Sequence, residues 1–251
     1  ASFKPIKVSQ AAQTHAGTYY LVDGEGWINA SDLSTTDNRI EAVQKVLNEK
    51  YNNQERISVY VNQLDTDRVA AINDEKSMYA ASVSKLGVLY YAQERLSQKK
   101  LSLSDEYQYT SAVNGFPGAY DPDGSGKISK MPDDKNYSLE NLLKAVAQNS
   151  DNVATNILGY YVTNQYDKAF QKSVDKAAAT SWNMDKKELT ARAAGTLMEA
   201  VYRQNGDIIN YLSSTDYDGE RISKNIDVPV AHKIGDAYDF KHDVAIVYAD
   251  S

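Results

Sequence analysis

The sequence of 251 residues contains no cysteine and only three histidines, His15, His232 and His242. The lack of cysteine excludes disulfides, thiolate metal sites and a cysteine nucleophile. Three histidines argue against a zinc site with several histidine ligands. A Ser-His-Asp triad would have to use His232 or His242, and we interpret both as structural. We therefore expect neither a metal nor a cofactor.

Positive charge is sparse and dispersed. The chain has 27 Lys and Arg and 34 Asp and Glu, which gives a net charge of -7. No basic block is present of the kind that binds nucleic acid. No apolar run reaches the roughly 18 residues that a membrane helix needs. The composition, 42% hydrophobic and 24% charged, is that of a globular protein with one sizeable domain, or one domain and a small module. We expect no nucleic-acid partner and no transmembrane segment.

Residues 1–36 differ in pattern from the rest of the chain. The stretch GTYYLVDGEGWINASDLS alternates aromatic or apolar residues with small polar ones around DGEG, which predicts a β-hairpin and a short turn. The pieces YYLV, Gly26-Trp27 and ASDL resemble the end of an SH3-like GW wall-binding module of Gram-positive surface proteins. The alternative is a β-extension of the main domain.

The pattern after residue 36 predicts strands at both ends and helices between them. Apolar side chains at helical spacing predict a first helix over 37–51, and two alternating runs predict a hairpin over 56–73. Two helices broken at Asn149-Ser150 and another at 191–203 follow a loop rich in Gly, Pro and Asp. The last strands are expected at 228–235 and 242–250. One antiparallel sheet built from both ends of the chain accounts for this order.

The run YAASVSKLGVLYYAQERL, residues 79–96, places a lysine one helical turn after a serine. Ser82 and Lys85 have the spacing of neighbours on a helix, whereas Ser84 does not. A lysine in an apolar setting has a lowered pKa and can accept the proton of a serine hydroxyl. The alternative is that Ser82 caps the helix and Lys85 reaches water, and this motif by itself favours that alternative.

Two further motifs favour a catalytic role for Ser82 and Lys85 over this alternative. Residues 150–152, Ser-Asp-Asn, lie at the break between two predicted helices. Residues 232–235, His-Lys-Ile-Gly, end a predicted strand and are followed by Asp236. S-x-x-K, S-D-N and K-T-G together are the signature of serine β-lactamases and penicillin-binding proteins. The first two are intact here and the third reads Lys-Ile-Gly, in the same order along the chain.

The sequence resembles the class A β-lactamase-like and penicillin-binding serine hydrolase family over about residues 37–251. The resemblance is carried by AASVSKLGVLYYAQERLSQKKLSLSDEYQY, YSLENLLKAVAQNSDNVATNIL, LTARAAGTLMEAVY and VAHKIGDAYDFKHDVAIVYAD. It implies an α+β fold in two parts, with an antiparallel sheet flanked by helices beside an all-helical subdomain. The site would lie between these two parts.

The resemblance also implies a role for each motif residue. Ser82 would be the acylated nucleophile and Lys85 its proton acceptor. Ser150 would pass a proton to the leaving group, and Asn152 would hold Lys85 and the substrate amide. Lys233 would supply positive charge beside Ser150 and the substrate carboxylate. The backbone N–H groups of Ser82 and Asp236 would form the oxyanion hole, and Ile234 and Gly235 would line the substrate site.

The chain departs from the family pattern at two functional positions. No E-x-x-L-N motif occurs in the region that should activate the deacylating water, where Asp175, Asp185 and Glu188 are the nearest acids. We therefore expect a long-lived acyl-enzyme and poor β-lactamase activity. Ile234 stands where the family has Thr or Ser, so the hydroxyl that would bind a substrate carboxylate is lost.

Two other expectations concern the chain end and a loop. The sequence stops at Ser251, without the last strand and helix that the family carries, so we expect an unpaired strand edge. The stretch DPDGSGKI, residues 121–128, matches the front of an EF-hand calcium loop. Pro132 stands at the twelfth position, where such a loop has Glu, so we interpret the stretch as a turn.

Two functions remain in competition at this stage. The first is a serine hydrolase that forms an acyl-enzyme on Ser82 with a β-lactam or a peptidoglycan-derived D-alanyl substrate. The second is a non-catalytic, wall-associated binding protein on the same fold. The N-terminal piece suggests an extracellular or cell-surface bacterial location, with contact to the cell wall, under either interpretation.

Overall fold

The computed structural model describes residues 6–34 and 36–249, and the chain divides into two compact units, residues 1–74 and 75–251. The domain boundary predicted between residues 36 and 37 falls inside the first unit and stays a prediction. Residues 1–5 and Thr35 of the expected small module lie outside the described residues. Asp250, at the end of the last expected strand, and Ser251 lie outside them too.

The first unit begins with a three-stranded antiparallel sheet in the order β1-β2-β3. Strand β1 covers Val8–Thr14, β2 covers Gly17–Val22 and β3 covers Gly26–Asn29, followed by a short 3-10 turn at Ala30–Asp32. The β2–β3 pair confirms the predicted hairpin around DGEG. Strand β1 was not predicted, because its sequence VSQAAQT is mostly polar and exposed.

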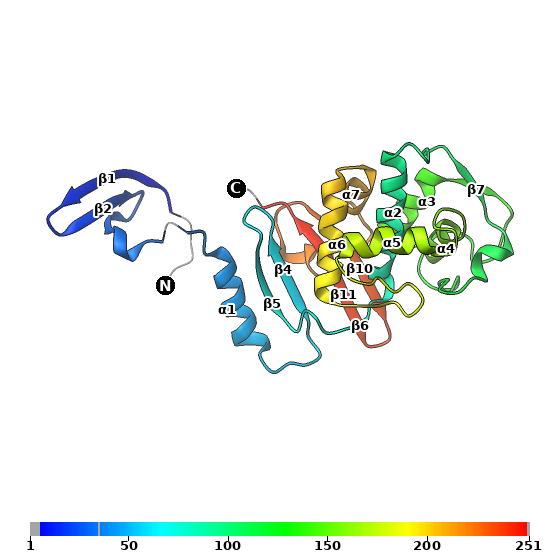
Figure 1. Ribbon diagram of the computed structural model, residues 1–251, viewed down its shortest axis with the longest axis horizontal. Coiled ribbons are helices and arrows are strands. Elements are labelled where there is room, and N and C mark those ends of the chain that lie inside the picture. The colour runs from blue at the N-terminus through cyan, green and yellow to red at the C-terminus, as the bar shows by residue number, and fades with distance from the viewer. Residues whose placement is uncertain (1–5, 35, 250–251) are drawn as a thin grey trace. The chain divides into compact units, whose positions relative to one another are not determined.

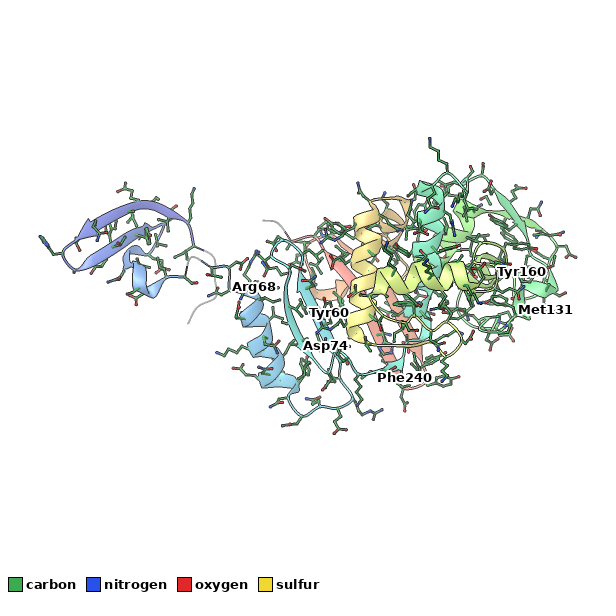
Figure 2. The ribbon with its side chains drawn as sticks, in the orientation of Figure 1. Tyr60, Arg68, Asp74, Met131, Tyr160 and Phe240 are labelled. Carbon is green, nitrogen blue, oxygen red and sulfur yellow. The ribbon has the colours of Figure 1, made fainter. Side chains whose placement is uncertain are left out.

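The second half of the first unit is a helix on a hairpin. Helix α1 spans Arg39–Tyr51, β4 spans Val59–Gln63 and β5 spans Arg68–Ile72, as the sequence predicts. Apolar side chains of the helix and of the hairpin form its core, with Ile40, Leu47 and Ala70 buried. Arg68, labelled with Tyr60 in Figure 2, also pairs with Glu41 of α1.

The second unit is organised around one buried helix. A 3-10 turn, η2 (Ala81–Lys85), leads directly into α2 (Leu86–Ser97), whose Leu86, Val88 and Leu89 are fully buried. Helix α2 packs against all the other helices of this unit (Figure 1). These are α3 (Leu139–Asn149), α4 (Asn152–Tyr161), α5 (Lys168–Ala178), α6 (Ala191–Gln204) and α7 (Asp207–Leu212).

The strands of the second unit come in pairs. β10 (Val230–Ala237) and β11 (Phe240–Val247) form an antiparallel hairpin, with α6 against β11 and α7 against β10. Phe240 begins the returning strand (Figure 2). Two shorter pairs join β6 (Met78–Tyr79) to β9 (Glu188–Leu189) and β7 (Glu106–Gln108) to β8 (Asn136–Ser138). Short 3-10 turns, η3 and η4, lie at Ser111–Asn114 and Ser223–Asn225.

In the described part of the chain β4 pairs with β5, and β10 pairs with β11. The two hairpins belong to different compact units, and the single sheet expected from both ends of the chain stays a prediction. Within those same residues β11 has a ladder partner on one side only. No described helix is long and apolar enough to cross a membrane.

Candidate active site

Ser82 lies in the first turn of the 3-10 segment that leads into α2. The residue before it, Ala81, has a left-handed backbone with φ +48°, a conformation that costs energy for a residue with a side chain. The chain therefore turns sharply at this point, and Ser82 stays half-buried while its neighbours are buried. Within the residues described, the Ser82 hydroxyl makes no hydrogen bond to Lys85.

Lys85 is completely buried one turn later. Its Nζ atom donates to Ser150 O at 2.6 Å and to Asn152 Oδ1 at 2.5 Å, and it lies 3.4 Å from Ser150 Oγ. Burial holds the pKa of the Lys85 amine well below its usual range, and the nearby charge of Lys233 lowers it further. The sequence predicted an apolar setting for this lysine; the structure buries it as expected, but its immediate partners, Ser150 and Asn152, are polar.

Lys233 reaches the same serine from β10. Its Nζ atom donates to Ser150 Oγ at 2.8 Å and to Ile234 O at 2.9 Å, and the side chain is almost completely buried. Burial lowers the pKa of Lys233 to about 7, against an opposing effect of Asp243. Ser150 Oγ therefore lies between two buried amines whose pKa values are both lowered.

The Ser-Asp-Asn motif forms the tight turn between α3 and α4. Ser150 ends α3 in a left-handed conformation with φ +54°. Asp151, fully buried, begins α4 by accepting the Ala154 N–H at 2.8 Å. This geometry turns the Asn152 amide toward Lys85 and leaves the Ser150 hydroxyl facing β10. The helix break predicted at Asn149-Ser150 is confirmed.

The loop that resembled a calcium site packs onto this turn. Asp151 Oδ2 accepts the N–H groups of Lys127 and Ile128 at 2.6 and 2.9 Å. A Cβ atom on Gly126, whose φ is +127°, would lie 2.3 Å from that carboxylate. Ser125 Oγ donates to Ser150 O at 2.7 Å. No group of three metal-ligating acids or histidines occurs among the described residues.

Strand β10 lies directly against the turn that carries Ser82. A Cβ atom on Gly235 would lie 2.6 Å from Ala80 O and 3.0 Å from Val83 N, so only glycine allows this approach. Asp236 follows at the exposed end of the strand. The structure thus brings Ser82, Lys85, Ser150, Asn152 and Lys233 to one place. The oxyanion hole from Ser82 N and Asp236 N stays a prediction.

Two residues of the site, Tyr120 and Lys187, were not predicted from the sequence. Tyr120 is buried, shares a 2.5 Å hydrogen bond with Ser84, and has its pKa raised by burial. The Nζ atoms of Lys85 and Lys187 lie 4.6 and 4.5 Å from the centroid of its ring. The only signal for Tyr120 was its position before the glycine-rich loop, and Lys187 stood in the segment with no clear pattern.

His232 and His242 have different surroundings. The side chain of His232 is buried, with Nδ1 3.1 Å from the Asp243 carboxylate and Nε2 3.0 Å from Thr215 Oγ1 and 3.1 Å from Asp218 Oδ1. Burial opposes its protonation, but the two carboxylates outweigh burial and raise its pKa. His242 Nε2 contacts Tyr79 O at 2.8 Å. Neither ring contacts Ser82 in the described structure.

The acids in the segment before α6 have different surroundings, and the charge of Asp185 acts on Lys187, whose pKa it raises against the larger effect of burial. Asp175 Oδ1 accepts Gln171 Nε2 at 2.5 Å and the Trp182 N–H at 2.7 Å. Glu188 is exposed on β9. The residue that contacts Tyr120 from this segment is Lys187, whose amine donates to Gly118 O at 2.9 Å. No contact links a carboxylate of this segment to Ser82 in the part of the chain described.

Comparison with known proteins gives the family. The sequence profile of the family described as the Beta-lactamase enzyme family matches residues 38–251. No curated protein matches the chain. Many solved structures match the chain, and the three described next share its fold at 15–18% identity.

Three solved structures illustrate the likeness. A variant of PBP-A, solved as an acyl-enzyme complex with penicillin-G, is 15% identical with a TM-score of 0.62, over 82% of this chain and 86% of that one. A β-lactamase from Chitinophaga pinensis DSM 2588 is 18% identical with a TM-score of 0.62, over 84% and 85%. A variant of the class A β-lactamase of the last common ancestor of Gram-negative bacteria is 15% identical with a TM-score of 0.65, over 83% and 84%.

Proposed function

Because the chain belongs to the β-lactamase enzyme family and is a serine hydrolase of the β-lactamase type, we propose that Ser82 is acylated by β-lactams or D-alanyl-type wall substrates and deacylates slowly. The observation that supports this proposal is the convergence of Lys85 and Lys233 on Ser150. Burying two amines around one hydroxyl costs desolvation free energy that apolar side chains would not cost. The two amines do provide a path for protons.

The acylation step begins with transfer of a proton from Ser82 Oγ. An unprotonated amine has two N–H bonds and one lone pair. The two close acceptors of Lys85 Nζ, Ser150 O and Asn152 Oδ1, use both N–H bonds. The lone pair is then free to accept the proton of Ser82 as its oxygen attacks the carbonyl carbon. Such hydrogen bonds often tighten only when substrate is bound.

Collapse of the tetrahedral intermediate needs an acid for the leaving group. The oxyanion would be held by the N–H groups of Ser82 and Asp236, and each such donor contributes about 10²–10³ in rate. Ser150 Oγ, 2.8 Å from Lys233 Nζ, gives its proton to the leaving atom and takes one from a neighbouring amine. The C–N bond, or the C–O bond of an ester, then breaks and the acyl group stays on Ser82.

Deacylation is the slow step in this proposal. It needs a base that activates water beside the acyl carbonyl. The segment before α6 presents Lys187 to the site, while Asp175 is occupied by Gln171 and Trp182. The acyl-enzyme therefore accumulates, as expected of a penicillin-binding protein rather than an efficient β-lactamase.

The test is intact-protein mass spectrometry after incubation with penicillin-G and with a thioester, with Ser82→Ala as the control. We expect a stable adduct of the penicillin mass on the native protein and none on Ser82→Ala. Rapid turnover without an adduct would mean that a deacylating base exists. No adduct and no turnover would contradict acylation of Ser82.

The alternative is a non-catalytic wall-associated binding protein. It is favoured by one observation, that the described Ser82 hydroxyl is not hydrogen-bonded to Lys85. We also propose that the first β-sheet is a wall-binding module of SH3-like type and that the protein acts outside the cell. A pull-down of purified Gram-positive cell walls by residues 1–74, compared with residues 75–251, tests the wall contact.

A further inference from the structure

The two faces of β10 carry different chemistry at its C-terminal end. Successive side chains of a strand point to opposite faces. Lys233 and Gly235 face Ser150 and the turn that carries Ser82. Ile234 and Asp236 therefore share the other face, and they flank Gly235, which contacts the turn that carries Ser82. Ile234 is only 6% exposed, whereas the Asp236 side chain is 48% exposed.

Arg221, in the segment between α7 and β10, contacts this second face through Asp236. One of its terminal nitrogens donates to Asp236 Oδ2 at 2.5 Å, and its side chain is 18% exposed. The positive charge of Arg221 is therefore already matched by a carboxylate of the same chain. Its Nε–H is buried and finds no acceptor among the described residues.

This arrangement is unfavourable for a substrate carboxylate. An incoming anion would have to displace Asp236 from Arg221 and would then face the displaced like charge. Ile234 offers no hydroxyl to compensate. The other nearby cation, Lys233, is engaged with Ser150 Oγ and Ile234 O. Each of these features weakens binding of a negatively charged group at this end of β10.

The same arrangement matches a primary carboxamide. The exposed Asp236 carboxylate can accept a hydrogen bond from the amide NH₂ group. The Arg221 guanidinium, which has terminal N–H donors besides the one bound to Asp236, can donate to the amide oxygen. A neutral amide can thus bind both members of the ion pair instead of competing with them.

We propose that Asp236, Arg221 and Ile234 are specificity-determining residues that select acyl donors ending in a carboxamide, and disfavour donors ending in a free carboxylate, next to β10. This inference rests on the proposed function, since it concerns the substrate that acylates Ser82. The expected substrates are amidated wall peptides or other donors that end in a carboxamide, rather than donors that end in a free carboxylate.

The experiment uses two thioesters that differ only at this group: the N-benzoylglycyl thioesters of thioglycolic acid and of thioglycolamide. Release of the thiol is followed with a thiol reagent, and because the protein has no cysteine the reagent reports only the leaving group. We expect the native protein to be acylated by the amide at least about tenfold faster than by the acid.

Matched variants locate the cause. Asp236→Asn keeps the backbone N–H and removes the charge. The ratio of the acylation rates with the amide and with the acid should therefore fall to near one. Ile234→Thr with Asp236→Asn should reverse it. Glu106→Gln removes an exposed carboxylate from β7 and should leave the preference unchanged.

The outcomes separate this inference from the proposed function. Equal acylation of Ser82 by both thioesters in the native protein would overturn the inference and leave the proposed function intact. Acylation of Ser82 by neither thioester, nor by penicillin-G, would overturn the proposed function and the inference with it. A preference unchanged in Asp236→Asn would overturn the role of Asp236.

Discussion

Lys85 and Lys187 approach the same aromatic ring, with their Nζ atoms 4.6 and 4.5 Å from the centroid of Tyr120. Burial lowers the pKa of Lys85 most, and the charges of Lys233 and Lys187 lower it further. Tyr120 in turn is fixed by its hydrogen bond to Ser84, on the same turn as Ser82. The ring therefore links the segment before α6 to Lys85.

The first prediction concerns a variant that lacks the amine of Lys187. In Lys187→Met the pKa of Lys85 should rise, so the acid limb of the pH profile for acylation moves to higher pH. Below that limb the acylation rate falls by about tenfold for each pH unit of the shift. The profile is measured with penicillin-G by mass spectrometry. Lys187→Arg, which keeps a charge, should restore much of the profile.

The matched control is Lys186→Met, since Lys186 is an exposed neighbour. It should leave the acid limb in place. An unmoved limb in Lys187→Met, in a variant that unfolds at the same temperature as the native protein, would show that Lys187 does not influence Lys85.

The second prediction concerns the buried amine of Lys233. Its pKa of about 7 lies below the usual 10.5, so between these values the unfolded chain binds a proton that the folded protein does not. The contribution of Lys233 to the free energy of unfolding therefore rises with pH from 7 to about 10.5. Lys233→Met should lose this slope and be more stable at pH 7, by roughly 0.5–2 kcal/mol.

The same variant should be acylated roughly 10²–10⁴-fold more slowly, because Ser150 loses its proton donor. Urea denaturation at several pH values and acylation by penicillin-G measure the two effects. Lys172→Met, on the exposed face of α5, is the control and should change neither. A destabilised Lys233→Met at pH 7 would contradict the idea that this amine is kept at a cost to stability.

Much of this site could be predicted from the sequence, because its parts are local. Ser82 and Lys85 are spaced as helix neighbours, and Ser150 ends a helix at a visible break. Spacing and order were sufficient to place these residues, and the structure brings them together. Their catalytic roles came from the resemblance to a family and stay predictions.

The remaining site residues depend on contacts between segments that are distant in the sequence. Such contacts produce no periodic pattern of apolar residues. Lys187 and Arg221 both have left-handed backbones in irregular segments, so no helical or strand pattern marks them. Helix α5 was missed although Phe170, Val174 and Ala178 are buried at a spacing of four, because the surrounding residues are polar. The loop 121–128 was compared with a calcium site because glycine and aspartate serve both tight turns and metal loops.

The third prediction concerns the buried imidazole of His232. Its pKa is raised above 6.5, so its stabilising contribution is fully present below pH 6.5 and is lost as pH rises through the folded-state pKa. Protonated, the ring can donate to Asp243 and to Asp218 together, and so joins β10 to β11 and to the segment after α7. Neutral, it has a single N–H and can serve only one carboxylate.

In His232→Gln the free energy of unfolding at pH 6 should fall by roughly 1–3 kcal/mol, and the loss should shrink at higher pH. Urea denaturation from pH 5 to 9 measures this. The exposed His15→Gln is the control and should show no such pH dependence. A loss in His232→Gln that is the same at pH 6 and pH 9 would mean that packing, rather than charge, is what the histidine provides.

The fourth prediction tests the loop that supports the Ser-Asp-Asn turn. In Gly126→Ala the added methyl would lie 2.3 Å from the Asp151 carboxylate, on a backbone with φ +127°. Either feature alone costs about 1–3 kcal/mol. The variant should lose stability and should also be acylated more slowly, because Asp151 fixes the turn that positions Ser150. Thermal unfolding and acylation by penicillin-G are measured on the same sample.

Gly115→Ala is the matched control, since its added methyl would meet only Ala112 O at an ordinary 3.7 Å. It should change neither quantity by much. A Gly126→Ala variant that is destabilised but acylated at the native rate would show that the turn keeps its geometry without the loop. In that case the loop contributes to stability alone, and Lys85, through Ser150 O and Asn152 Oδ1, holds the turn in place.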